Sequence, residues 1–302
     1  MEAGKPRIAF SVVMVTYARD HIVRSAIEQV AAAAEGRGDI EFILVDNNED
    51  RTDRSAFIPE RFASRKYVKH GFNKGVSARN DGAFAAEGAY IAFVDDDAFL
   101  NPPGVFDRYE EAFASDPLIA IVTARHIDKE TGETPRASFP HTDKRLPKDR
   151  PFQTFRFQGN GFAMRRTAFE AIGPMSNDYL YGMEEIDYAY KVIDAGFKIL
   201  YDPSVWVVEH NDPGGRLPER RVQTMRLTNK MIISFKYMPA RYVPLSFFLF
   251  SAYVLYLNKL RLNPLESFGD FLRWARANPG GRRPIGPDAI RYIRECGGQP
   301  WK

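Results

Sequence analysis

The sequence predicts an α/β fold in which a mostly parallel sheet is flanked by helices and followed by a C-terminal helical extension. Over the first 100 residues, short apolar runs alternate with segments of helical spacing, which is the pattern of βαβ units. Polar or acidic residues follow several of these runs directly, and beyond Gly214 the pattern is helical only. The chain has 302 residues, of which 44% are hydrophobic and 27% charged, so it can bury a large core.

The first part of the chain supplies four strands. Apolar runs predict strands at 10–15, 41–45 and 90–94, and a short strand is expected at 66–69. Helices are expected between the strands at 21–34 and 76–86. Parallel strands joined by helices bring their carboxyl ends to one edge of the sheet, where ligands bind. We therefore expect Thr16, Asp46 and the run Asp95 to Asp97 to converge on one site.

The second part continues the same domain as far as residue 215. The expected elements are a helix at 104–114, a strand at 119–124, a surface loop at 129–151, a strand at 158–165, helices at 166–172 and 183–195, and strands at 198–201 and 205–208. The helix at 183–195 has its apolar residues at helical spacing and acidic residues in its first turn. The last strand leads to His210.

Three consecutive carboxylates, Asp95, Asp96 and Asp97, end the fourth apolar run. Like charges at the end of a buried strand repel unless a cation lies among them, and Mg²⁺ or Mn²⁺ prefers one or two carboxylates together with phosphate oxygens of a substrate. The alternative is that the acids cap a helix that starts after Asn101-Pro102-Pro103. The run alone leaves both interpretations open.

The charges divide unevenly along the chain. From Gly214 to Lys302 there are 16 Lys and Arg against 5 Asp and Glu, whereas the preceding residues have 26 against 34. A basic extension suggests contact with membrane lipid or nucleic acid, or else a solvated helical face. Helices are expected at 219–237 and 265–277, and the charge-free stretch 242–258 lies between them. Burial, a partner subunit, in-plane membrane attachment and membrane spanning all stay open for this stretch.

The compartment is indicated by two further features. The one cysteine, Cys296, excludes an internal disulfide, and no long apolar segment precedes the first strand. We expect a cytoplasmic protein, with peripheral attachment to the inner face of the membrane as an open possibility.

The motifs occur in an order that resembles the inverting family-2 glycosyltransferases of the GT-A fold, which is a Rossmann-like fold. The resemblance covers roughly residues 8–215, and the C-terminal helices are loosely similar to those of rhamnosyltransferase-type members. It rests on these motifs: Val15-Thr16-Tyr17, Val45-Asp46-Asn47-Asn48 with Asp53, Asn73-Lys74-Gly75 with Arg79-Asn80 and Gly82, Asp95-Asp96-Asp97, Gly159-Asn160-Gly161, Glu184-Glu185-Ile186-Asp187, and His210.

The resemblance implies a nucleotide diphosphate sugar donor, linked to UDP or dTDP, bound by residues 1–100. Asp46 would hydrogen-bond the base, with Thr16 and Tyr17 lining its pocket. Asp97 of the Asp95-x-Asp97 (DXD) motif would bind Mn²⁺ or Mg²⁺ directly, Asp95 would contact the ribose or metal-bound water, and His210 would contact the metal or a phosphate. The other residues implied on the donor side are Asn48, Asn73, Lys74, Arg79, Asn80 and Asp96.

The resemblance also places a catalytic base at the second acid of the motif, which is Glu185 here, with Glu184 as the alternative. A base must accept the proton of the acceptor hydroxyl while the anomeric carbon is attacked from the opposite face. Residues 101–215 would carry this base and the acceptor, a glycan, lipid or small molecule. The expected pocket residues are Gly159, Asn160, Gly161, Tyr181 and Met183.

Other interpretations remain for the single residues and for the chain. Asp46 can be a turn former, Arg79 a solvated helix residue and His210 a structural histidine. A nucleotidyltransferase would be expected to have a Gly-rich loop after the first strand, and Thr16-Tyr17-Ala18-Arg19 is not one. A non-catalytic nucleotide-binding scaffold at the membrane is the other alternative. We expect no nucleic acid partner, because no known binding module is present.

Overall fold

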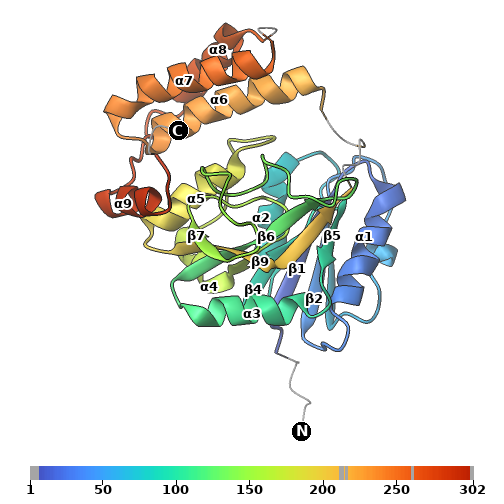
Figure 1. The fold of residues 1–302 in the computed structure, drawn as a ribbon. Coiled ribbons are helices and arrows are strands. Elements are labelled where there is room, and N and C mark those ends of the chain that lie inside the picture. The colour runs from blue at the N-terminus through green and yellow to red at the C-terminus, as the bar shows by residue number, and fades with distance from the viewer. Residues whose placement is uncertain (1–6, 211–213, 215–216, 260–261, 300–302) are drawn as a thin grey trace.

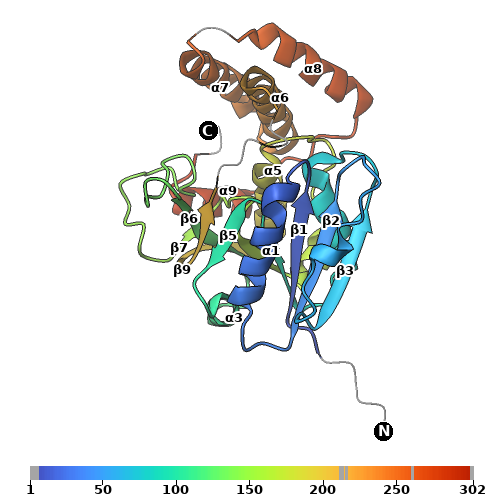
Figure 2. The same cartoon turned by 90° about the vertical axis from the view of Figure 1, so that its right-hand side faces the viewer.

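The computed structural model describes residues 7–210, 214, 217–259 and 262–299. A curled sheet has helices on both faces, and three of the C-terminal helices lie together above one end of this domain (Figures 1 and 2). The predicted α/β fold with a C-terminal helical extension is confirmed. The predicted division at residues 100 and 215 stays an interpretation, since one sheet runs through both parts.

The sheet has nine strands in the order β3-β2-β1-β4-β8-β6-β9-β5, with β7 paired to β9. Their bounds are β1 Phe10–Thr16, β2 Ile40–Asp46, β3 Ser64–Lys69, β4 Tyr90–Phe93, β5 Ala98–Asn101, β6 Ile119–Asp128, β7 Phe152–Thr154, β8 Phe162–Arg165 and β9 Lys198–Glu209. The helices are α1 Asp20–Ala33, η1 Ser55–Phe57, η2 Gly75–Ala78, α2 Arg79–Ala85, α3 Val105–Ser115, α4 Arg166–Ile172, α5 Glu184–Asp194, α6 Glu219–Tyr237, η3 Ala240–Tyr242, α7 Val243–Leu257, α8 Pro264–Ala277 and α9 Pro287–Glu295.

Strands β1 to β4 are parallel, as predicted, and their carboxyl ends are level. Thr16 pairs with Asp46 and Asp46 with Lys69, and the amide of Val94 donates to the carbonyl of Val13. Alternate strand residues pack on opposite faces, as the pleat requires. Phe10, Val12 and Met14 belong to a core with α1 and α3, whereas Val13 belongs to a core with α2, α4 and α5.

The second part of the sheet is mixed. Strand β8 runs antiparallel to β4 and β6, while β6 and β9 are parallel. The strand predicted at 158–165 begins only at Phe162, because Gly161 has a φ of +69° and residues 158–161 form a loop. The two strands predicted at 198–201 and 205–208 are one strand, with an irregularity in its pairing with β6.

Helix α6 packs into the core of the α/β domain, whereas α7 is largely exposed. Leu227, Ile232 and Ile233 of α6 join the core that contains α5. Among the described residues, Ala240–Leu257 is long and apolar enough to cross a membrane by length and composition, and 11% of it is buried. Phe248 of α7 is 72% exposed and Tyr256 is 80% exposed. Burial against the α/β domain therefore does not account for α7.

Candidate active site

One arginine connects the two acidic clusters. Arg79 begins α2, and its Nη2 donates to Asp95 Oδ1 at 2.8 Å while its Nη1 donates to Glu184 Oε1 at 2.9 Å. The guanidinium is buried, and it lies between carboxylates that are far apart in the sequence. The carboxylates at the end of β4 and those at the start of α5 therefore belong to one site.

The acidic run does not cap a helix. Asp97 is followed by β5, and the next helix, α3, begins only at Val105 after Gly104. The alternative of helix capping is therefore wrong, because the chain re-enters the sheet directly after the acids. Instead, Asp96 Oδ1 accepts from Arg19 Nη1 at 2.6 Å, and Asp97 Oδ2 lies 3.2 Å from the same nitrogen.

The donor set at the acidic run fits a divalent cation. Burial raises the pKa of Asp96 to about 6, although the Arg19 charge opposes it, and Asp96 Oδ2 is a buried oxygen without a hydrogen bond in the described part of the chain. The Arg19 guanidinium already places positive charge against Asp96 and Asp97. Two carboxylates supply the ligand number that Mg²⁺ or Mn²⁺ takes from protein when phosphates complete the shell.

His210 lies beside the acidic run, but no three-residue metal centre is formed within the described ranges. The His210 amide donates to the Asp97 carbonyl at 2.9 Å, and its ring lies 3.9 Å from that of Phe99, centroid to centroid. Its Nδ1 is 3.3 Å from Lys129 Nζ. Partial burial and the Lys129 charge lower the pKa of His210, which favours the neutral ring that a metal ligand needs.

The two predicted bases have different surroundings. Glu184 is buried and bound to Arg79 through Oε1. Glu185 is half-buried, and it forms no ion pair with any residue that the structure describes. Burial and the adjacent Glu184 carboxylate raise the pKa of Glu185, and the Arg79 charge lowers it. Of the two acids, Glu185 is the one that Arg79 does not hold.

The loop at 159–161 joins the two carboxylate groups. A Cβ on Gly159 would lie 2.3 Å from Glu185 Oε1, so the loop backbone touches this side chain. Asn160 Oδ1 accepts from the Asp95 amide at 3.2 Å, while Asn160 Nδ2 is a buried donor without a partner among the described residues. The loop therefore contacts both carboxylate groups, and it contains one buried amide nitrogen whose hydrogen-bonding capacity is unused within the described chain.

His126 on β6 supports this loop and was not predicted. Its Nε2 is 2.7 Å from the Asn160 carbonyl, and burial lowers the pKa of His126. A carbonyl only accepts, so Nε2 carries the proton and the ring is held neutral in that tautomer. The sequence offered no signal beyond a histidine in an apolar strand.

Asp46 is enclosed by its own chain. The side chain is 0% exposed, and its Oδ2 accepts from Tyr67, Lys69 and Arg54, none of which was predicted as a site residue. Oδ1 accepts from the amide and side chain of Asn48. Although burial opposes it, these hydrogen bonds lower the pKa of Asp46. For Asp46 to hydrogen-bond a nucleotide base, one of these partners would have to be displaced.

The remaining donor-side residues lie near the same edge with local partners. Thr16 is buried and Tyr17 half-buried where β1 ends. Lys74 Nζ is 2.5 Å from Asp81, Asn73 Oδ1 accepts from the Gly75 amide, and Asn80 bonds the backbone of Met175. Asn73 and Asn80 therefore shape the turn and the helix, and Lys74 is the one of the three that carries a charge near the edge.

The segment before α5 is held by α6. Gly182 and Met183 both have positive φ, of 80° and 69°, so the chain makes a tight left-handed turn into α5. Asn229 of α6 donates to the carbonyls of Tyr181 and Gly182 at 3.1 and 2.7 Å. Asn229 was not predicted, because a single polar residue in an amphipathic helix carries no such signal. The turn fixes the direction from which α5 starts.

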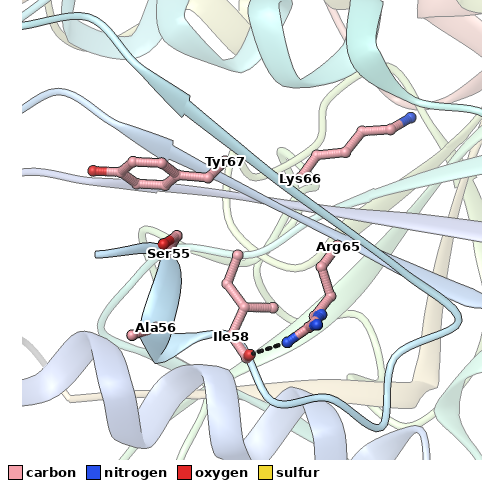
Figure 3. A pocket seen from close by; sticks show the side chains of 6 residues that line it. All are labelled: Ser55, Ala56, Ile58, Arg65, Lys66 and Tyr67. Carbon is pink, nitrogen blue, oxygen red and sulfur yellow. Dashed lines mark hydrogen bonds between the residues drawn. The ribbon is translucent and has the colours of Figure 1, made fainter. Parts of the chain in front are cut away.

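A hollow of about 320 Å³ lies beside the edge strand β3 (Figure 3). It is formed by η1 and β3, with the side chains of Ser55, Ala56, Ile58, Arg65, Lys66 and Tyr67 around it. None of the predicted site residues lines it. The hollow is separate from the carboxylate site.

Comparison with solved structures identifies the fold. Mannosyltransferase PcManGT from Pyrobaculum calidifontis, in complex with GDP-Man and Mn²⁺, aligns with a TM-score of 0.58 at 17% identity, over 96% of this chain and 80% of that one. GalNAc-T7 with UDP, GalNAc and Mn²⁺ gives a TM-score of 0.58 at 17% identity, over 94% and 59%. The chain has the fold of GT-A glycosyltransferases.

Comparison with sequences identifies the family. EpsH of Bacillus subtilis (strain 168), named as a glycosyltransferase, is 29% identical over 54% of this chain and 48% of its own length. The minor teichoic acid biosynthesis protein GgaB of the same organism is 38% identical over 33% of this chain and 11% of its own. The matches thus span about half or less of these relatives. The family model for glycosyl transferase family 2 matches residues 11–173, more than half of the chain, and the chain therefore belongs to glycosyl transferase family 2.

Proposed function

We propose that this chain transfers a hexosyl or deoxyhexosyl group from a UDP- or dTDP-linked sugar to an acceptor hydroxyl, with inversion and with a divalent metal. The observation that carries the proposal is the Arg79 bridge between Asp95 and Glu184. A donor bound at the acidic run would present its anomeric carbon to the acids of α5, which is the arrangement that the reaction needs.

Glu185 is proposed as the base. It adjoins the Gly159 loop and is unpaired in the described chain, whereas Glu184 is committed to Arg79. A raised pKa makes Glu185 a stronger base once it is ionised, because a higher pKa means a greater affinity for the hydroxyl proton. Glu184 would instead hold the Arg79 guanidinium in place between the two acidic groups.

Asp95 and Asp97 are proposed to hold Mn²⁺ or Mg²⁺, with His210 and Asp96 beside them. The ion would neutralise charge on the departing nucleotide diphosphate. Arg19 contacts Asp96 and Asp97 and would have to yield part of this position when the donor binds. Lys74 is proposed to face the diphosphate.

Thr16, Tyr17 and Asn48, together with Asp46, are proposed to form the nucleoside pocket where β1 and β2 end. Asn48 Oδ1 holds the Ala18 amide at 2.7 Å, so the chain after β1 is fixed over this edge. Asn73 is proposed on the ribose side of the same pocket.

The acceptor is proposed to enter between the 159–161 loop and the turn at Tyr181 and Met183. Asn160 Nδ2 would donate to a sugar oxygen, since it is a buried donor otherwise unpaired among the described residues. The name of GgaB, a teichoic acid biosynthesis protein, favours cell-surface polysaccharide or glycolipid assembly over other pathways, and we propose such a role in the cytoplasm.

Helix α7 is proposed to be covered by the membrane surface or by a second copy of the chain. Its exposed apolar residues include Phe248 and Tyr256, with Arg241 and Lys259 at the ends of the helix. Aromatic residues and flanking cations are typical of an in-plane interfacial helix. Vesicle flotation and sedimentation velocity distinguish lipid binding from dimer formation.

A panel of sugar nucleotides tests the proposal, with thermal shift and release of nucleoside diphosphate as readouts. We expect one donor to raise the melting temperature and to turn over with Mn²⁺, and neither effect in EDTA. Glu185→Gln should retain the thermal shift and lose turnover. Formation of a sugar nucleotide from a sugar phosphate would support a nucleotidyltransferase, and binding without turnover in the wild type would support a scaffold.

A further inference from the structure

The outward face of α7 is made of apolar and aromatic side chains. Eight of the thirteen large apolar side chains that are exposed in the described part of the chain lie on α7 or in the first half of α8. On α7 they recur at helical spacing as one stripe, and every exposed residue of this fully described helix is apolar or aromatic. The stripe, here called the α7 face, consists of Leu245, Phe248, Leu249, Tyr253, Tyr256 and Leu257.

The inner face of α7 is occupied by the neighbouring helices. Ser246 is buried, and its hydroxyl shares a hydrogen bond of 2.7 Å with the hydroxyl of Ser234 on α6. Phe247 packs edge-on against Phe271 of α8, with ring centroids 5.1 Å apart, and Val254 is buried. A hydroxyl therefore points inward while the large apolar side chains point outward, which is the reverse of a helix that faces water. The α7 face is thus a surface that needs a cover.

Positive charges stand at both ends of the α7 face. Arg241 precedes α7 and Lys259 follows it; both are exposed, and residues 242–258 between them carry no charge. In its described part, the C-terminal extension exposes ten Lys and Arg side chains against four Asp and Glu. Apolar side chains enter the acyl region of a bilayer, tyrosines lie at its interface and cations contact its phosphate groups. The arrangement therefore matches a lipid surface that carries negative charge.

A second copy of the chain fits the α7 face less well than lipid does. In a two-fold dimer through α7, antiparallel helices would bring the Arg241 end of one copy against the Lys259 end of the other, and parallel helices would bring each end against its own equivalent. Like charges would then meet at both ends, and residues 242–258 supply no acid to separate them. An anionic lipid surface attracts the same two cations.

The length and the packing of α7 indicate that it lies along the surface. Its 15 residues rise about 22 Å, whereas the hydrocarbon core of a bilayer is about 30 Å thick. Its inner face is held by α6 and α8, so lipid would contact the α7 face only. These three helices lie together above one end of the α/β domain (Figures 1 and 2). Both features favour in-plane attachment over membrane crossing.

We propose that the α7 face binds in the plane of a membrane that contains anionic lipids. The inference deepens the role proposed above for α7, on which it rests, by naming one partner and one orientation. Six large side chains leave water when the face enters the lipid, while Arg241 and Lys259 lie at the level of the headgroups. Helix α6 connects this face to the proposed site, because Ser234 bonds α7 and Asn229 bonds the carbonyl before Met183.

Flotation of the full chain with phosphatidylcholine vesicles, with and without about one third phosphatidylglycerol, tests the proposal. We expect the wild type to bind the anionic vesicles, and Phe248→Ser and Tyr256→Ser each to weaken this binding about tenfold or more, because an aromatic side chain no longer enters the lipid. Phe84→Ser is the matched control, since Phe84 is 65% exposed on α2, and it should bind as the wild type does. A wild type that stays unbound, or two α7 variants that bind as tightly as it does, would overturn the proposal.

The contribution of charge has its own pair of variants. Arg241→Gln should weaken binding to the anionic vesicles about fivefold, because one cation at the surface is lost. Arg108→Gln removes an exposed arginine from α3, at the far end of the domain, and should change nothing (Figure 1). Equal binding of the wild type to both kinds of vesicle would contradict an anionic partner.

Sedimentation velocity without lipid distinguishes the membrane from a second copy. A monomer supports the proposal, and a dimer that Phe248→Ser dissociates would assign the α7 face to a second copy and refute it. The melting temperatures of the α7 variants should stay near that of the wild type, because the altered side chains are exposed. These measurements need neither donor nor metal, so their failure leaves the proposed glycosyl transfer intact, and failure of the sugar-nucleotide panel leaves membrane binding intact.

Discussion

Gly159→Ala should disable the base and leave the fold intact. A Cβ at this position would lie 2.3 Å from Glu185 Oε1, 3.1 Å from Cδ and 3.2 Å from Cγ. Ordinary contact begins at 3.4 Å, so the carboxylate oxygen has to withdraw by about 1.1 Å. A displacement of about 1 Å in a catalytic group costs roughly 10²-fold in rate, equivalent to about 2.7 kcal/mol of activation free energy.

The same substitution should change stability little. Turning the end of the Glu185 side chain away from its preferred rotamer costs about 0.5–1.5 kcal/mol, and replacing glycine by alanine where φ is unstrained returns about 0.4–1 kcal/mol. These terms nearly cancel in the free energy of unfolding. Gly159 is not among the glycines with positive φ, so alanine fits its backbone.

Gly161→Ala is the matched control. It would place its Cβ 2.3 Å from Val207 Cγ1 in the packed core, on a residue with a φ of +69°. Overpacking and the left-handed backbone together cost about 2–5 kcal/mol, so this variant should lose stability first. The assays are release of nucleoside diphosphate with Mn²⁺ and urea unfolding. Activity of Gly159→Ala within threefold of the wild type, or a loss of stability equal to that of Gly161→Ala, would refute the reasoning.

The other predictions concern the acids and the helix behind them. Glu185→Gln should lose about 10²–10⁴ in kcat, and Glu184→Gln should lose less. Because burial and Glu184 raise the pKa of Glu185, the acid limb of the wild-type pH profile of kcat/KM should lie above the usual glutamate pKa of about 4.3. For the same reason, the stability that protonated Glu185 contributes should be lost as pH rises through its raised pKa. Urea titrations of Glu185→Gln should not show this loss. Arg79→Gln should move this limb to higher pH, since the charge that lowers the pKa of Glu185 is gone; an unmoved limb would contradict the bridge. EDTA should abolish turnover and Mn²⁺ should restore it, as measured by nucleotide release. Lys236→Met should lower the free energy of unfolding by about 3–5 kcal/mol, because Asp187 then stays buried without its partner at 2.5 Å, whereas a loss below 1 kcal/mol would show that the pair is not needed.

The parallel strands β1, β2 and β4 could be predicted because each contains a continuous apolar run of at least four residues, whereas β3 has only the apolar pair Tyr67 and Val68. The strands β5 and β7 could not, since four and three residues show no period and one of them follows three acids. The acidic run indicated the chemistry of the site but not the secondary structure that follows it. That it enters a strand and not a helix depends on the pairing of β5 with β9, which lies more than 100 residues away.

The carboxylate site was predictable as a set of residues and not as a set of contacts. Asp95 and Glu184 are recognisable by position, but their common partner is an arginine whose spacing in α2 looks like that of a solvated residue. Arg54 and Arg19 carried no signal for the same reason, because an arginine in a loop is ordinary until its carboxylate partner is located. Lys230 shows the converse, since a lysine in a helix with many charges is expected to be solvated and this one is buried.

Helix α6 also connects the extension to the start of α5. Asn229 holds the carbonyl of Gly182 before α5, and Lys236 Nζ is 2.5 Å from Asp187 in the first turn of α5. Glu185 lies between these two anchors, so α6 fixes the backbone on both sides of the proposed base. The contacts from Asn229 and Lys236, two turns apart on one helix, therefore fix the backbone from which the proposed base extends.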